Sequence, residues 1–192
     1  MSFYSQDELQ SLGFKRLGRG VRLSRKASIY NPANIEIGDF SRIDDFCVLS
    51  AGEGGISIGK HVHIAVFCSL IGNGRIELAD YSGISSRVSI YSSNDDYSGE
   101  FMTNPTVPSQ FTHVSHAPVT IGRHVIIGAG SVVLPGVTLH DGAGVGALSL
   151  VIQDCESFGM YFGLPARRKG KRSMRLLEIE RQLVASEHIE RE

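Results

Sequence analysis

The sequence predicts an all-β solenoid, a parallel β-helix with a helix at each end and one long inserted loop. Three observations predict it: aliphatic residues return at every sixth position, glycine is abundant at 22 of 192 residues, and tryptophan is absent. A period of six fits neither the helical repeat of 3.6 nor the strand repeat of 2. It fits a triangular coil of three short segments joined by tight turns, in which each coil buries its face on its neighbours.

The repeat is clearest in the stretch from Val119 to Val151, and earlier sets of hexads begin near residues 17, 37, 58 and 78. The aliphatic residues expected to point into the prism there are Ile121, Ile127, Val133, Leu139, Val145 and Val151. The residue two places before such a position is also expected inside, as at Val62, Cys68, Val88, Val125, Ser131 and Val137. Glycine or another small residue follows at the corner, where a Cβ is often costly.

The chain divides into three parts. Residues 1–16 are expected to form an N-terminal cap, with a short helix that ends near Gly13. Its first turn has the spacing of a capping box, from Ser5 to Glu8. The β-helix is expected over residues 17–157, with an inserted loop over residues 96–118 where the six-residue phase fails.

Residues 158–192 are expected to form a closing turn followed by an α-helix. From Arg172 onward, Leu176, Ile179 and Leu183 lie at helical spacing and predict an amphipathic helix.

Composition narrows the class of protein. The formal net charge of −1 gives no electrostatic footprint for nucleic acid or an anionic membrane. No apolar run approaches 18 residues, so membrane insertion is not expected, and the N-terminus does not resemble a signal peptide, which favours the cytoplasm. Cysteine spacing indicates neither a disulfide framework nor a zinc motif, and Cys47 and Cys68 fall on inward positions.

The hexads, and the segment YFGLPARRKGK from Tyr161 to Lys171 that follows them, resemble the left-handed β-helix hexapeptide-repeat acyltransferases. Within that family, the segments RIDDFCVLS, KHVHIA, SSRVSIY, DDYSG and NPTVP resemble bacterial enzymes that acetylate sugars for surface polysaccharides such as O-antigen. Among such enzymes, the chain resembles the dTDP-3-amino-3,6-dideoxygalactose N-acetyltransferases. The resemblance implies a left-handed coil, a homotrimer with active sites between subunits, acetyl-CoA as co-substrate and a nucleotide sugar as acceptor.

Acyl transfer from a thioester requires an aligned nucleophile, a proton acceptor and a donor for the carbonyl oxygen. Related O-acetyltransferases carry a catalytic histidine in a His-Pro pair of the loop, where this chain has Asn104-Pro105. That departure favours an amine acceptor over a hydroxyl. The candidate catalytic residues are Asp96, His116 and His63, and the candidate substrate-binding residues are Asp95, Asn104 and His113. Each has a plainer interpretation, as a turn former or as a loop or surface histidine.

Small residues that let the backbone approach an amide chain are expected to bind the pantetheine arm of CoA. These are Gly128, Ala129, Gly146 and Ala147, and the basic residues placed for the CoA phosphates are Arg167, Arg168 and Lys171. No metal is expected. The alternatives are a galactoside- or maltose-type sugar O-acetyltransferase, a γ-type carbonic anhydrase with zinc held by histidines across a subunit interface, and a non-catalytic scaffold of the same fold.

Overall fold

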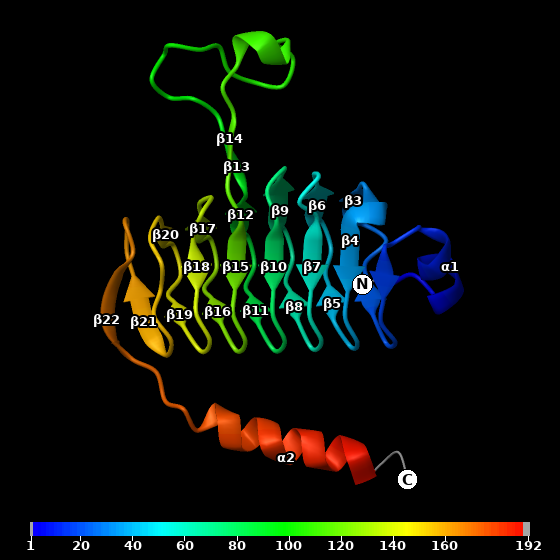
Figure 1. Ribbon diagram of the computed structural model, residues 1–192. Helices are drawn as coiled ribbons and strands as arrows, with labels where there is room; N and C mark the ends of the chain where they lie inside the picture. Colours follow the sequence, from blue (N-terminus) through cyan, green and yellow to red (C-terminus); the bar gives the residue numbers. More distant parts are fainter. Residues whose placement is uncertain (1, 190–192) are drawn as a thin grey trace.

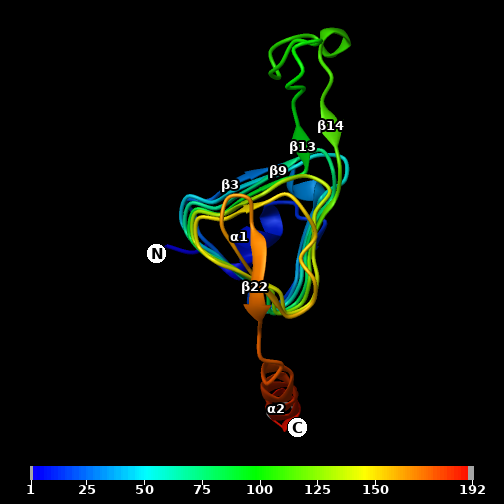
Figure 2. The same ribbon diagram turned by 90° about the vertical axis from the view of Figure 1, so that its left-hand side faces the viewer.

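The chain forms a triangular parallel β-helix, seen from the side in Figure 1 and along its axis in Figure 2. The computed structural model describes residues 2–189, with side chains described through residue 186. Seen from the C-terminal end, successive coils wind clockwise as they approach the viewer, so the β-helix is left-handed. The predicted fold class is confirmed.

Each side of the triangle is one sheet built mainly from parallel strands, one from each coil. The first sheet contains β1 (Arg16–Leu17), β4 (Ile35–Ile37), β7 (Ile56–Ile58), β10 (Ile76–Leu78), β15 (Val119–Ile121) and β18 (Thr138–Leu139). The second contains β2 (Arg22–Leu23), β5 (Arg42–Ile43), β8 (His63–Ile64), β11 (Gly83–Ile84), β16 (Ile126–Ile127), β19 (Gly144–Val145), β21 (Gly159–Phe162) and β22 (Arg167–Lys171). The third contains β3 (Ser28–Tyr30), β6 (Val48–Ala51), β9 (Ser69–Gly72), β12 (Ser89–Tyr91), β17 (Val132–Val133) and β20 (Leu150–Val151).

We call the corner between the first and second sheets corner I, that between the second and third corner II, and that between the third and first corner III. The elements outside the three sheets are α1 (Gln6–Ser11), α2 (Leu176–Ile189), the 3-10 turns η1 (Pro32–Asn34) and η2 (Ser109–Phe111), and the hairpin strands β13 (Ser93–Asn94) and β14 (Ser115–His116). The predicted capping box is present, since the Ser5 side chain accepts from the Glu8 N–H and the Glu8 side chain accepts from the Ser5 N–H.

The C-terminal helix begins at Leu176, four residues later than the pattern predicts. Residues 167–171 form β22, which pairs antiparallel with β21 and closes the last coil. Arg172 still belongs to this closure, since its N–H donates to the carbonyl oxygen of Phe158 at 2.7 Å, so the chain leaves the prism before the helix begins. Sequence reasoning did not anticipate this hairpin, because its basic, exposed residues carry no hydrophobic alternation.

The inward positions form one continuous core, as predicted. The aliphatic residues from Ile121 to Val151 are at most 4% exposed, and the second inward set is at most 3% exposed. The cysteines Cys47 and Cys68 belong to this core as free thiols, and burial raises the pKa of Cys155 to about 12. Each strand pairs in register with the equivalent strand one coil away, so that inward residues stack on one another, as Ile56 on Ile76 and Ile76 on Val119.

The glycines that directly follow an inward aliphatic residue are required by stacking rather than by an unusual φ. A Cβ on Gly38 would lie 2.5 Å from the carbonyl carbon of Gly59 in the next coil, and one on Gly122 would lie 2.7 Å from the backbone nitrogen of Asp141. The positive φ falls two residues later, often on a large side chain, as at Phe40 (58°). The expectation of tight corners is therefore correct, but its cause is the close approach of successive coils.

Corner I stacks aromatic rings from four coils. Phe40, His61, Tyr81 and His124 follow one another with ring centroids 5.1 to 5.3 Å apart, and all four have φ between 54° and 61°. A left-handed non-glycine residue costs roughly 1–2 kcal/mol. Stacked aromatic pairs return about 0.5–1.5 kcal/mol each beyond their buried area, so the stack offsets much of the strain.

Removing core volume from one coil tests how the solenoid is stabilised. Leu70 is fully buried and its register neighbours are Leu49 and Ile90. Leu70→Ala is expected to lower the free energy of unfolding by about 2–5 kcal/mol, because neighbouring coils cannot close the cavity. Ile152→Ala, at a residue 42% exposed, should change it by much less. Denaturant unfolding measures both, and equal losses would contradict a core built from inward positions.

Candidate functional site

The outer face of the second sheet carries a groove of about 310 Å³. Its lining combines an imidazole, two hydroxyls and apolar side chains: His63, Ala65, Gly83, Ile84, Ser85, Ser86 and Ile126. Residues His63, Gly83 and Ile126 are register neighbours on β8, β11 and β16, so the groove runs across three successive coils. Its floor is low at Gly83, where an added Cβ would meet nothing within 4 Å.

His63 is held in place by a buried carboxylate. Its Nε2 lies 2.9 Å from Oδ2 of Asp44, whose side chain is only 5% exposed, and Oδ1 of Asp44 accepts from Nε of Arg42 at 2.6 Å. The imidazole is 52% exposed, as predicted for the outward position of its hexad. Sequence reasoning missed Asp44 and Arg42. The only signal was the pair Asp44-Asp45 at a corner where other hexads have small residues.

Corner II continues the groove toward the C-terminal end. The pairs Gly128-Ala129 and Gly146-Ala147 follow Ser85-Ser86 in the next two coils. A Cβ on Gly128 would collide with the backbone of Ala147, and one on Gly146 would collide with the ring of Phe162. Packing within the chain therefore already requires glycine at both positions, whatever else the corner binds.

The predicted phosphate-binding residues lie on β22 at the end of the prism and are all exposed. Arg167 donates to Oε1 of Gln153 at 3.2 Å, and Arg168 pairs with Glu156. These contacts orient the two guanidinium groups along the last coil. Arg172, by contrast, is turned inward, where it donates to the carbonyl oxygens of His124 and Gly142 at 2.6 and 3.2 Å.

The inserted loop is an arm that stands away from the prism at corner III, with β13 and β14 as its base (Figures 1 and 2). Nδ1 of His116 lies 2.7 Å from the hydroxyl oxygen of Ser93 across this base. The ring of His113 contacts Phe101 edge-on at 4.9 Å between centroids. Both histidines line a hollow of about 440 Å³ within the arm. The exposed apolar residues of the arm are Tyr97, Phe101, Met102, Phe111 and Val114.

Two predicted site residues of the arm, Asp96 and Asn104, form hydrogen bonds within its turns. Oδ2 of Asp96 accepts from the hydroxyl of Ser98 at 2.7 Å, and this bond, with backbone N–H groups of residues 98, 99 and 101, lowers the pKa of Asp96 despite some desolvation. A lowered pKa makes this carboxylate a weak proton acceptor. Asn104, at φ 75°, accepts from the N–H and hydroxyl of Thr106 at 3.0 and 2.6 Å. Asp95 lies beside Asp96 and is half-buried.

The predicted catalytic residues are not brought together within one chain. His63 lies on the second sheet, whereas Asp96 and His116 lie at corner III, which is the corner opposite that sheet. The prism stands between them. The predicted residues thus form two separate groups, a sheet group around His63 and an arm group around His116.

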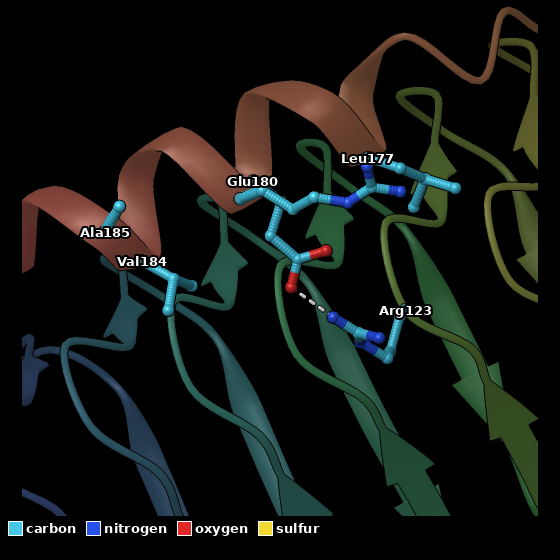
Figure 3. A pocket seen from close by; sticks show the side chains of 6 residues that line it. Arg123, Leu177, Glu180, Val184 and Ala185 are labelled. Carbon is cyan, nitrogen blue, oxygen red and sulfur yellow. Dashed lines mark hydrogen bonds and ion pairs between the residues drawn. The ribbon is translucent and has the colours of Figure 1, made fainter.

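The largest of the three hollows lies elsewhere, between α2 and corner I, and has a volume of about 530 Å³ (Figure 3). It is lined by Arg123, Leu177, Glu180, Arg181, Val184 and Ala185. Glu180 is the contact that ties α2 to the prism, since its carboxylate pairs with Arg123 and also lies 2.9 Å from Nε2 of His124. Two of the charged residues that line this hollow, Arg123 and Glu180, pair with each other, as expected where a helix docks on the prism.

The Glu180 contact depends on pH in a defined direction. Burial raises the pKa of Glu180, but the hydrogen bond with His124 and the charge of Arg123 outweigh it, so the pKa is lowered from its ordinary value of 4.5. A carboxyl group with a lowered pKa in the folded state stabilises that state above the ordinary value. The contribution is lost as the pH falls through the lowered value.

The described part of the chain holds neither a metal cluster nor a helical membrane span. Between residues 2 and 189, no three histidine, cysteine, aspartate or glutamate side chains gather as metal ligands would. In the same range, no helix has the length and hydropathy needed to cross a bilayer.

Comparison with known proteins places the chain beside sugar-modifying enzymes. No protein-family model matches it. A dTDP-4-amino-4,6-dideoxy-D-glucose acyltransferase of Escherichia coli is 54% identical over 180 residues, which is 94% of either chain.

Solved structures of AntD, an N-acyltransferase from Bacillus cereus, match over nearly their whole length. One, in complex with dTDP and 3-hydroxybutyryl-CoA, is 42% identical, covers 97% of this chain and 98% of that one, and has a TM-score of 0.92. Another, with dTDP-4-amino-4,6-dideoxyglucose and coenzyme A, covers 96% and 98% with a TM-score of 0.91 and 42% identity. Several AntD structures carry a replaced serine or a replaced aspartate.

Breaking the Glu180 contact should release α2. Glu180→Gln is expected to increase amide hydrogen exchange over residues 176–186 at pH 7, because a neutral amide pairs weakly with Arg123 and His124. The wild-type chain should show the same increase only as the pH falls below 4.5, the ordinary carboxyl value.

Glu178→Gln is the matched control, since Glu178 is exposed on the same helix. It removes the same charge without touching corner I. Equal exchange in both variants, measured by mass spectrometry, would contradict a docking role for Glu180.

Proposed function

The chain belongs to the family of the dTDP-amino-dideoxyglucose acyltransferases, and from that membership we propose that it transfers a short acyl group, acetyl in the first instance, from acyl-CoA to the 4-amino group of dTDP-4-amino-4,6-dideoxyglucose. The family-level prediction from the sequence is confirmed. The relatives' names put the amino group at carbon 4 of a dideoxyglucose, where the resemblance had indicated carbon 3 of a dideoxygalactose. They also describe an amine acceptor, as the absence of a His-Pro pair favoured.

The observation that carries the proposal is the groove on the second sheet. It joins a carboxylate-bound imidazole, two hydroxyls and a glycine hollow at the start of corner II. The amine nitrogen attacks the thioester carbonyl carbon, and the carbon–sulfur bond breaks. The nitrogen gives up a proton to His63, and the thiolate takes up a proton to leave as CoA thiol. A positioned proton acceptor contributes about 10²–10⁴-fold in such a step.

The hydroxyls of Ser85 and Ser86 supply donors for the thioester carbonyl oxygen or for the sugar. A serine and an aspartate ten positions later are the residues replaced in the AntD structures. In this chain Ser85 and Asp95 have that spacing, and so do Ser86 and Asp96. The serines lie in the sheet group and the aspartates in the arm group, which supports a role for both groups in one reaction.

The pantetheine arm is proposed to lie along corner II, over Gly128-Ala129 and Gly146-Ala147. Three coil spacings separate β11 from β21, roughly 14 Å at the usual strand separation. That span suits a thioester in the groove and phosphates near Arg167, Arg168 and Lys171 at the end of the prism. The phosphates and nucleotides of both substrates keep them from crossing membranes unaided, so we propose a cytoplasmic reaction that supplies surface-polysaccharide synthesis.

We propose a homotrimer in which the arm of one subunit reaches the second sheet of the next. Within one chain the arm and the groove are separated by the prism. The arm exposes Tyr97, Met102 and Phe111 at 86%, 57% and 52%. Exposed apolar residues on a projecting segment are typical of a surface that a partner covers. Asp95, Asn104, His113 and His116 would then face the sugar bound at the neighbour's groove.

Direct assay tests the function. The purified protein, dTDP-4-amino-4,6-dideoxyglucose and either acetyl-CoA or 3-hydroxybutyryl-CoA should release free thiol, with one acyl mass added to the sugar nucleotide. His63→Ala is expected to lower kcat on the order of 10²–10⁴-fold. His140→Ala, at an exposed histidine outside the groove, should leave it unchanged. Absence of thiol release with every acyl-CoA and dTDP-amino sugar tried would overturn the proposal.

Mixing variants tests the shared site. His63→Ala disables the sheet group, and the double variant Asp95→Asn/Asp96→Asn disables the arm group. Trimers reassembled from equal amounts should regain about a quarter of wild-type activity, because one site in four then pairs an intact sheet with an intact arm. If the mixture is no more active than its two parents, each site lies within a single chain.

A further inference from the structure

Asp44 is a buried carboxylate at a position where neighbouring coils have small side chains. It is the only charged residue among the buried polar residues in the described part of the chain, at 3% exposure. It follows Ile43, and the residues that follow the register partners of Ile43 in the two adjacent coils are Ser24 and Ala65. One coil further along, the equivalent residue is Ser85. A buried charge destabilises a protein unless it is paired. Since small side chains serve the neighbouring coils, stacking does not explain the carboxylate.

Both oxygens of Asp44 are directed at side chains on the outer face of the second sheet. Oδ1 accepts from Nε of Arg42 at 2.6 Å, and Oδ2 lies 2.9 Å from Nε2 of His63. Arg42 and His63 are register partners on β5 and β8, so one carboxylate lies beside two adjacent outward residues. The bond to Arg42 fixes the carboxylate, and the carboxylate then fixes the imidazole, which is otherwise half exposed.

The contact also determines which nitrogen of His63 carries the proton. A carboxylate only accepts hydrogen bonds, so Nε2 must be the donor. In the neutral ring Nδ1 is then the acceptor. His63 lines the groove beside Gly83 and Ser85, where the glycine leaves room for a reacting group.

We propose that Asp44 is the positioning residue of His63, holding the ring as the Nε2–H tautomer with Nδ1 ready to take the proton of the sugar amine. The inference rests on the proposed function. As the new carbon–nitrogen bond forms and the carbon–sulfur bond breaks, the amine proton moves to Nδ1. The imidazolium then donates from both nitrogens, and its positive charge lies against Asp44. Arg42 keeps the carboxylate in place throughout.

Asp44→Asn tests the proposal with little change of shape. An asparagine can turn its NH₂ group toward Nε2 and so favour the wrong tautomer. Nitrogen-15 NMR of the imidazole should show the Nε2–H tautomer in the wild type and its loss in the variant. The kcat should fall by about 10- to 100-fold, the usual cost of losing a supporting hydrogen bond, with the KM for acyl-CoA unchanged.

Asp45→Asn is the matched control. It removes the same charge one residue later, but that carboxylate binds Ser24 and Lys26 instead of His63. Tautomer and kcat should both stay as in the wild type. In a His63→Ala background, Asp44→Asn should cause no further loss of kcat, because a residue that acts through His63 has nothing left to position.

Two outcomes would overturn the proposal: an Nδ1–H tautomer in the wild type, or an equal loss of kcat from Asp44→Asn with and without His63. The first needs neither substrate nor a folded variant. It therefore tests the role of Asp44 even if the acyl-transfer assay fails, whereas failure of that assay would count against the proposed function alone.

Discussion

The structure depends on one constraint, the in-register stacking of coils at a strand separation of about 4.8 Å. Each strand residue of the prism lies beside its counterpart in the next coil, so the neighbouring coil restricts which side chains fit at that position. Gly38 and Gly122 are glycines because the next coil's backbone occupies the place of their Cβ. At corner I, Asp80 and Asp141 accept hydrogen bonds from the backbone of the preceding coil at 2.8 Å, and aromatic rings stack beside them.

The proposed site arises where a column of stacked residues changes its chemistry. Along the outer face of the second sheet, the column passes from Arg42 through His63 to Gly83 and Ile126, and the glycine opens the groove between an imidazole and an aliphatic side chain. The neighbouring column places Asp44 where other coils have small residues. Because the scaffold is rigid, these two departures set the geometry without any loop to hold them, which suits the alignment that acyl transfer demands.

The fold could be predicted from sequence because stacking gives the chain its six-residue period. The inward positions are apolar or small, and the residue directly after an inward aliphatic residue is usually small, as at Gly38 and Gly122. The site could be predicted only in part. The outward position of His63 followed from its place in a hexad, but its partner Asp44 lies one coil earlier in the chain and meets it only through stacking. Asp96 and Asn104 of the arm were predicted as site residues, but in the structure both form hydrogen bonds within turns. Short polar side chains in loops commonly bond to nearby backbone and side-chain groups. The basic strand β22 could not be predicted, because its sequence has no alternation of apolar and polar residues.

Separation of the two groups of site residues also limits how the proposed enzyme can work. A β-helix has no hinge across its section, so no closure within one chain can carry Asp95 or His116 around the prism to His63. In the proposed reaction, completion of the site would therefore come from assembly, with the arm reaching outward to a neighbouring subunit. Its length, its antiparallel base and its exposed apolar tip fit that requirement. Regularity, which makes the prism stiff, is thus the reason that catalysis in the proposed trimer has to be shared between subunits.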